Sequence, residues 1–141
     1  MISSSQFHPL TVHFPIALLI VAFFFEVLAL NYKNNYRFRR ASLYLFLLGT
    51  LGAIVAVITG SLFTEDMRGA GHDVMEDHHQ FAFLTMYLAI LVSLFKLYLV
   101  FKKKEESSLK WVSFITMFIV MITVGLAGYY GGSLVYDYMI K

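Results

Sequence analysis

Apolar and polar residues separate along this chain into four long apolar runs joined by short polar stretches. Each run is close to the ~20 residues that an α-helix needs to cross the hydrocarbon core of a bilayer. Two runs carry no charged residue, and the other two carry one each. We therefore predict an all-α integral membrane protein, a single domain over 1–141 built as a four-transmembrane-helix bundle. The expected helices span about 10–31, 41–63, 79–102 and 110–136.

Composition supports this class. Of 141 residues, 59% are hydrophobic and 14% are charged, which is too little charge to cover a soluble domain of this size. Cysteine is absent, which excludes disulfides, thiolate-bound metals, iron–sulfur clusters and haem attached through a Cys-x-x-Cys-His motif. The basic residues lie in two loops rather than along one stripe. The lipid bilayer is therefore an expected partner and nucleic acid is not.

The two basic loops predict how the chain lies in the membrane. They follow the first and third helices, whereas acidic residues dominate the loop after the second. Short basic loops stay in the cytoplasm. We expect a multi-pass protein of the bacterial inner membrane, with the N-terminus, the C-terminus and every histidine outside. The basic residues of these two loops are Lys33, Arg37, Arg39, Arg40, Lys102, Lys103, Lys104 and Lys110.

The two halves of the chain resemble each other faintly. His8 precedes Glu26 by 18 residues, and His78 precedes Lys96 by 18 residues. A basic turn and a glycine-containing helix follow in each half. This pattern fits two pseudo-symmetric helical hairpins related by an axis along the membrane normal. It also fits a coincidence shared by any two hairpins that start on the same side, and the sequence leaves both interpretations open.

All five histidines lie near the predicted outer surface, in two groups. His8 and His13 precede the first apolar run, and His72, His78 and His79 precede the third. Neutral imidazole binds haem iron or a transition metal without adding charge to an apolar site. Single histidines are also tolerated at a water interface without any function. Two groups at one depth favour a site between the first and third helices.

A b-type haem with two axial imidazoles needs ligands from two separated segments. We expect one ligand from each group, and the four candidates are His8, His13, His78 and His79. In the first group, His13 is preferred because it lies deeper along the helix. In the second, His78 shares a helical face with Lys96, because 18 residues make five turns. The sequence does not choose between His78 and His79.

A transition metal without haem is the alternative cofactor. His72, Glu76 and His79 share one face if their segment is helical. Together with His13 they would form a metal site for zinc, copper or iron. The segment also contains one Glu-x-x-His spacing, although a carboxylate-bridged di-iron site would need that spacing twice.

Prolines and glycines bear on how the helices begin and pack. Pro9 and Pro15 lie in an unusual motif at 8–15, and we expect them to mark the start of the first helix and to break its opening segment. Small residues recur along the second and fourth helices and predict close helix contacts. They would also leave a slot for a flat macrocycle. The small residues are Gly52, Ala56, Gly60, Gly125, Gly128 and Gly132.

Glu26 and Lys96 are the two charges inside the apolar runs. Each lies four or five residues from the basic end of its run, so their depths match. Opposite charges at one depth on different helices predict an intramembrane ion pair that faces the bundle interior. We interpret it as a structural pair rather than a proton relay, because the sequence shows no polar path continuing across the membrane. Snorkelling of Lys96 to the surface is the alternative.

These features resemble the bacterial membrane-protein family called domain of unknown function 2231. The resemblance rests on His-Pro-x-x-Val-His-Phe-Pro at 8–15, on an acid late in the first helix and a base late in the third, and on Gly-Gly-x-Leu-Val-Tyr at 131–136. That family usually has Asp and Arg where this chain has Glu26 and Lys96. Its members occur fused to or beside cytochrome c and Rieske domains. The resemblance therefore implies periplasmic or membrane redox proteins as partners.

The combined features favour a membrane electron-transfer subunit with haem b near the outer face. It would pass electrons between a periplasmic redox protein and a quinone or a partner subunit. An electron carrier or complex subunit fits this pattern better than a stand-alone enzyme. The alternatives are a non-haem metal-binding membrane protein and a structural subunit of a larger membrane complex. The sequence leaves homo-oligomerisation open.

Overall fold

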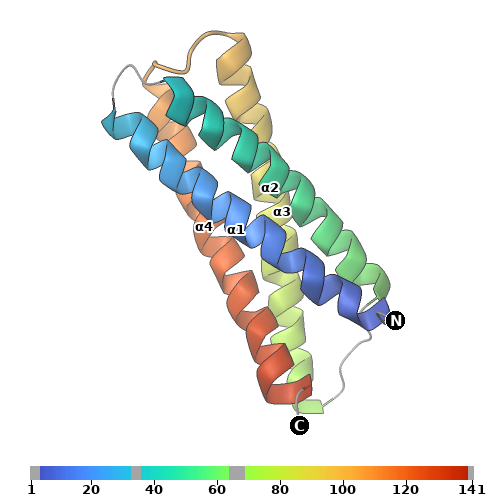
Figure 1. Ribbon diagram of the computed structural model, residues 1–141. Coiled ribbons are helices and arrows are strands. Elements are labelled where there is room, and N and C mark those ends of the chain that lie inside the picture. Colours follow the sequence, from blue (N-terminus) through green and yellow to red (C-terminus); the bar gives the residue numbers. More distant parts are fainter. Residues whose placement is uncertain (1–3, 33–35, 64–68, 140–141) are drawn as a thin grey trace.

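The computed structural model of the protein is a bundle of four long helices (Figure 1). It describes residues 4–32, 36–63 and 69–139, and the side chains of 4–10, 63, 70 and 139 lie outside that description. Four helices are long and apolar enough to cross a membrane. The elements are α1 (Ser4–Asn31), α2 (Tyr36–Phe63), the short 3₁₀ helix η1 (Gly69–Gly71), α3 (His72–Phe101), α4 (Leu109–Ser133) and the π-helical turn η2 (Leu134–Met139).

The helices form two hairpins that pack side by side. Helix α1 packs mainly on α2, and α3 packs mainly on α4; α2 also touches α3, and α1 touches α4. Helices α1 and α3 therefore stand diagonally across the bundle. The α1–α2 and α3–α4 connections lie at one end, which we call the basic end. Helix α1 begins and α4 ends at the opposite end, which we call the histidine end (Figure 1).

Side-chain burial repeats between the two hairpins. All six buried positions of the described part of α1 recur as buried positions of α3, 70 residues later. Five buried positions of α2 recur in α4, 71 residues later. The repeat suggested by the sequence is therefore supported by packing. The α1 positions are Pro15, Leu19, Ala22, Phe23, Glu26 and Ala29, and the α2 positions are Ser42, Phe46, Gly49, Ala53 and Ala56.

Apolar residues occupy both the inner and the outer faces of the helices. Leu19, Phe46 and Val120 lie in the core and are at most 1% exposed. Phe24 and Leu91 point outward and are more than half exposed. In a bilayer, apolar side chains can point outward, because the lipid hydrocarbon is as apolar as the protein core. The described surface therefore suits contact with a bilayer.

Aromatic side chains with a polar group mark both ends of the bundle. Tyr32, Tyr36 and Trp111 are exposed at the basic end, and Tyr129 and Tyr136 are exposed at the histidine end. Such residues favour the two membrane interfaces, where one part of the side chain is apolar and another is hydrated. These residues suit a bundle whose long axis crosses the bilayer.

The expected break in the first helix is wrong. Pro9 and Pro15 both lie inside one uninterrupted helix, α1. Proline has no backbone N–H, so a helix lacks one hydrogen bond at each internal proline. Membrane helices tolerate this where neighbouring helices support the segment. Here the Pro15 ring is buried, and its Cβ would lie 3.3 Å from a Cβ placed on Gly52 of α2. Glycine at 52 therefore makes room for the proline on the facing helix.

Small residues bring α1 and α2 close together. A Cβ on Gly49 would lie 2.9 Å from two atoms of Leu19, so only glycine fits there without a shift. The fourth helix differs from expectation, because a Cβ on Gly125 or Gly132 would meet nothing within 4 Å. Gly128 makes an ordinary contact with Ile16. Of the glycines in the two predicted stripes, those with a close neighbour on the facing helix therefore include Gly52 of α2 but not Gly125 or Gly132 of α4.

Candidate functional site

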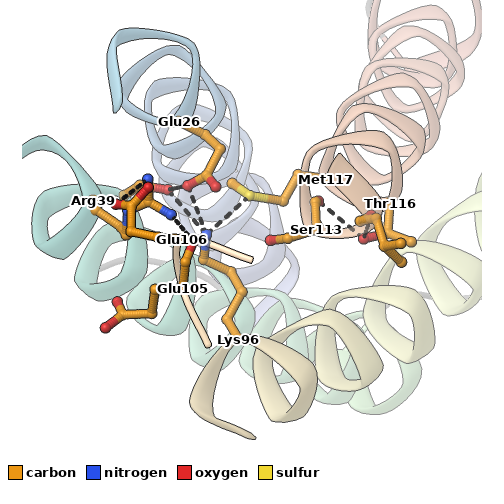
Figure 2. Close-up of polar contacts among 10 residues, drawn as sticks. Glu26, Arg39, Lys96, Glu105, Glu106, Ser113, Thr116 and Met117 are labelled. Carbon is orange, nitrogen blue, oxygen red and sulfur yellow. Dashed lines mark hydrogen bonds and ion pairs between the residues drawn. The ribbon is translucent and has the colours of Figure 1, made fainter. Parts of the chain in front are cut away.

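Two charged side chains meet in the bundle interior. Lys96 Nζ on α3 donates a hydrogen bond to Glu26 Oε2 on α1 at 2.7 Å. The Lys96 side chain is 6% exposed and the Glu26 side chain 3%. The charges that the sequence placed at one depth therefore pair across the diagonal of the bundle, and Lys96 does not snorkel to the surface (Figure 2).

Neighbouring helices complete the surroundings of the pair. The Ser42 hydroxyl on α2 donates to Glu26 Oε2 at 2.6 Å. Lys96 Nζ also lies 3.4 Å from Ser42 Oγ and 3.3 Å from Met117 Sδ on α4. All four helices thus contribute one side chain. Lysine has three N–H donors, and these three contacts match that number.

Sequence reasoning missed Ser42 and Met117. A serine in an apolar run gives no charge signal, and a methionine gives none either. The signal that could have found Ser42 is its register: it occupies a buried face of α2 at the level of Glu26, and a serine, Ser113, recurs 71 residues later. Serine in a membrane helix commonly bonds polar groups of adjacent helices.

A small cavity opens beside the pair. Its volume is about 20 Å³, and its lining includes Glu26, Lys96 and Ser113. Towards the basic end it is lined by Arg39 and Lys110. Polar and charged groups therefore extend from the buried pair to the end of the bundle.

The connection at the basic end is held by polar contacts between the hairpins and by one ion pair within the second hairpin. Arg39 of α2 bonds the backbone oxygen of Glu105 and lies 2.9 Å from a carboxylate oxygen of Glu106. Arg40 lies 3.4 Å from the Glu105 carboxylate. Lys110 on α4 lies 3.7 Å from Glu106. The loop between α3 and α4 is thus fixed against the start of α2, as Figure 2 shows for Arg39.

His78 is the histidine that the structure positions most firmly. Its Nδ1 lies 2.9 Å from the backbone oxygen of Ala127 on α4. A carbonyl oxygen only accepts hydrogen bonds, so Nδ1 is the donor and carries the proton. The ring is half-buried and packs against Gly131, where an added Cβ would lie 3.0 Å from His78 Cε1. Glycine at 131 therefore makes room for the imidazole.

The structure separates His78 from His79. Lys96 points inward, and His78 shares its face five turns earlier, as the register predicts. His79 is also half-buried, with its ring centroid 5.9 Å from that of His78. The hydrogen bond to the neighbouring helix distinguishes His78 as the ring with a fixed orientation.

The remaining predicted ligands are spread over the histidine end. His13 is exposed on α1, and the side chain of His8 lies outside the described residues. His72 begins α3 and is exposed, as is Glu76, which accepts a 3.4 Å bond from Gln80. Among the described residues, no three histidines and acids lie close enough together to hold a metal ion.

The buried pair predicts strong coupling between Glu26 and Lys96. We expect Glu26→Gln or Lys96→Met alone to destabilise the bundle by roughly 3–5 kcal/mol, because each leaves an uncompensated buried charge. The double variant should recover much of that loss. Reversible unfolding in detergent measures all four proteins, and strictly additive losses would show that the two charges do not interact.

Comparison with known proteins places the chain among membrane proteins. No curated protein and no solved structure matches the chain. A family model described as "Predicted membrane protein (DUF2231)" matches residues 4–141, which include all four helices, the buried pair and the histidines. The chain therefore belongs to this family of membrane proteins.

Proposed function

We propose that this protein is a membrane electron-transfer subunit that binds a b-type haem at the histidine end, and that His78 is one of the residues that would hold it. The observation that carries the proposal is the hydrogen bond from His78 Nδ1 to the Ala127 carbonyl oxygen. Histidines that bind metals commonly donate their other ring N–H to a carbonyl or carboxylate, which fixes the tautomer and the ring orientation. The proton on Nδ1 makes Nε2 the nitrogen that would bind iron.

The repeat suggests the second ligand. His8 precedes His78 by 70 residues, the interval that relates the buried positions of α1 to those of α3. Gly60 precedes Gly131 by 71 residues, the interval that relates α2 to α4. On backbone register, His8 shares a face of α1 with Glu26. His8 and His78 would then hold the haem from two diagonal helices.

We propose His8 rather than His13 as the second haem ligand, because His13 is exposed in the structure. A haem held in this way supplies one-electron chemistry, and the chain contributes its ligands, their orientation and the apolar surroundings. We propose that the electrons pass to and from periplasmic or membrane redox proteins. The haem hypothesis is favoured over a non-haem metal site because His72 and Glu76 are exposed and belong to no three-residue cluster among the described side chains.

Haem content tests the proposal. Protein from haem-sufficient cells should be red and show a sharp α band on reduction. His78→Ala and His8→Ala should each remove most of the haem while the helices stay folded, whereas His79→Ala and His13→Ala should retain it. Absorption spectra and haem quantification give the result. A colourless wild-type protein that takes up no added haemin would refute the proposal.

A matched pair of glycine variants distinguishes displacement of the His78 ring from a general loss of helix packing. Gly131→Ala puts a methyl group 3.0 Å from His78 Cε1, so it should reduce haem content. Gly132→Ala adds the same methyl group where nothing lies within 4 Å, so it should not. Equal haem content in the two variants would argue against His78 as a ligand.

We also propose an orientation: the basic end lies in the cytoplasm of a bacterial cell, and the histidine end faces outward. Lysine and arginine dominate both short connections at the basic end, and short basic loops are retained in the cytoplasm. This would put the haem level with periplasmic redox proteins.

Because the chain has no cysteine, labelling of single cysteines tests this orientation directly. Cysteines at Ser4 and Asp73 should react with an impermeant reagent in intact cells, whereas a cysteine at Asn35 should react after lysis alone. Labelling at Asn35 in intact cells would place the histidine end in the cytoplasm instead.

A further inference from the structure

The Ser113 hydroxyl is a buried polar group that the ion pair does not use. The residue is 2% exposed, and Oγ has no hydrogen-bonding partner among the described residues. Leaving a buried hydroxyl unsatisfied is unfavourable, so such groups usually have a partner. Ser113 lines the cavity beside Glu26 and Lys96, and Figure 2 shows its side chain directed towards Lys96.

The repeat explains why a serine is found there. Ser113 on α4 corresponds to Ser42 on α2, and Lys96 on α3 corresponds to Glu26 on α1. In the first hairpin the serine donates directly to the acid. In the second, Lys96 turns towards Glu26, Ser42 and Met117, and these contacts match its three donors. The Ser113 hydroxyl is therefore left without the direct contact that its counterpart makes.

The cavity has the size and the chemistry for a single water molecule. A water needs at least about 10–15 Å³ of free volume and two to four polar partners, and this cavity offers about 20 Å³. A water there can accept the Ser113 O–H and donate to the Glu26 carboxylate, which lines the same space. It would satisfy the serine and add a hydrogen bond to the acid.

We propose that the cavity is a water-binding site that joins Ser113 to the Glu26–Lys96 pair and exchanges with solvent at the basic end alone. Exposure of the lining charges falls steadily inward, from 28% for Lys110 and 13% for Arg39 to 6% for Lys96. The Glu105 carboxylate, paired with Arg40, faces the same opening. Beyond the pair, the core is largely apolar, with Leu19, Ala22, Phe46, Ala89, Val92 and Val120. The buried hydroxyls of Thr50 and Ser93 in this part of the core are hydrogen-bonded to each other.

With this water, the Glu26–Lys96 pair would have a function besides holding the bundle together. Water that reaches Glu26 and Lys96 from one side lets their protons exchange with that side and no other. The site is thus a one-sided proton entry into the membrane interior. It lies at the opposite end from His78 and does not depend on haem binding.

A comparison of two buried hydroxyls tests the site. Thr85 Oγ1 on α3 also lacks a partner among the described residues, but Thr85 does not line the cavity. Thr85→Val keeps the volume and removes an unsatisfied hydroxyl, so it should raise the unfolding temperature or leave it unchanged. Ser113→Ala removes a partner of the water, so it should lower the unfolding temperature. A Ser113→Ala variant at least as stable as Thr85→Val would overturn the proposal.

Water contact can also be observed without relying on stability. Magnetisation transfer from water to the Lys96 side chain, measured by NMR in detergent or nanodiscs, should be present in the wild-type protein. Ser113→Val fills the cavity and should abolish the transfer, whereas Thr85→Val should preserve it. Absence of transfer in the wild-type protein, or its survival in Ser113→Val, would show that no water occupies the site.

Discussion

A charge inside a lipid bilayer has to find its partner within the protein, because the hydrocarbon offers no water and no counterion. In this bundle that requirement is met by Glu26 and Lys96, which lie on diagonal helices and reach each other through the centre. Each hairpin holds one of the charges. The hairpins are therefore joined by an interaction that neither can make alone, and loss of either charge leaves the other buried and uncompensated.

Helical register connects this pair to the other end of the bundle. His78 lies five turns before Lys96 on the same face of α3, so an inward lysine at one level implies an inward histidine at the other. His8 and Glu26 on α1 are also separated by five turns, and the 70-residue repeat relates them to His78 and Lys96. Helix α3 thus presents Lys96 to the interior near the basic end and His78 near the histidine end, and on backbone register His8 and Glu26 occupy the equivalent positions of α1. Between the two levels the core is largely apolar, with side chains such as Leu19 and Val120.

The separation of these levels gives a consistent division of roles. The proposed haem would lie where α4 supplies Ala127 and Gly131 to position His78. The proposed water site lies where Arg39, Glu105 and Lys110 connect the ion pair to the basic end. Electrons and protons would therefore meet the protein from opposite sides of the membrane.

Sequence patterns predicted those parts of the structure that depend on composition and register. Helix number, the family and the depth of the two charges follow from apolar run length, the motif at 8–15 and the positions of Glu26 and Lys96. The helices begin earlier than the apolar runs: α3 begins at His72 rather than near 79, because polar residues at a membrane surface extend a helix without raising its hydropathy. That extension brings the histidines into the helix.

Other features depend on contacts between helices, which a pattern along one helix does not contain. The contact of Pro15 on α1 with Gly52 on α2 is one of them. The orientation of the His78 ring depends on a carbonyl oxygen of α4. The roles of Ser42 and Ser113 depend on three-dimensional proximity to the charge pair, although their recurrence at a fixed interval was present in the sequence.

The central claim is that Glu26 and Lys96 occupy equivalent positions in two hairpins and are held by each other. Exchanging the charges tests both parts at once, through the unfolding temperature of Glu26→Lys, Lys96→Glu and the double reversal in detergent. Each single reversal sets two like charges together in the interior and should be severely destabilised. The double reversal should recover most of the wild-type unfolding temperature, because the pair re-forms in mirror order and Ser113 can then donate to the acid at position 96. A double reversal no more stable than the worse single variant would contradict the account.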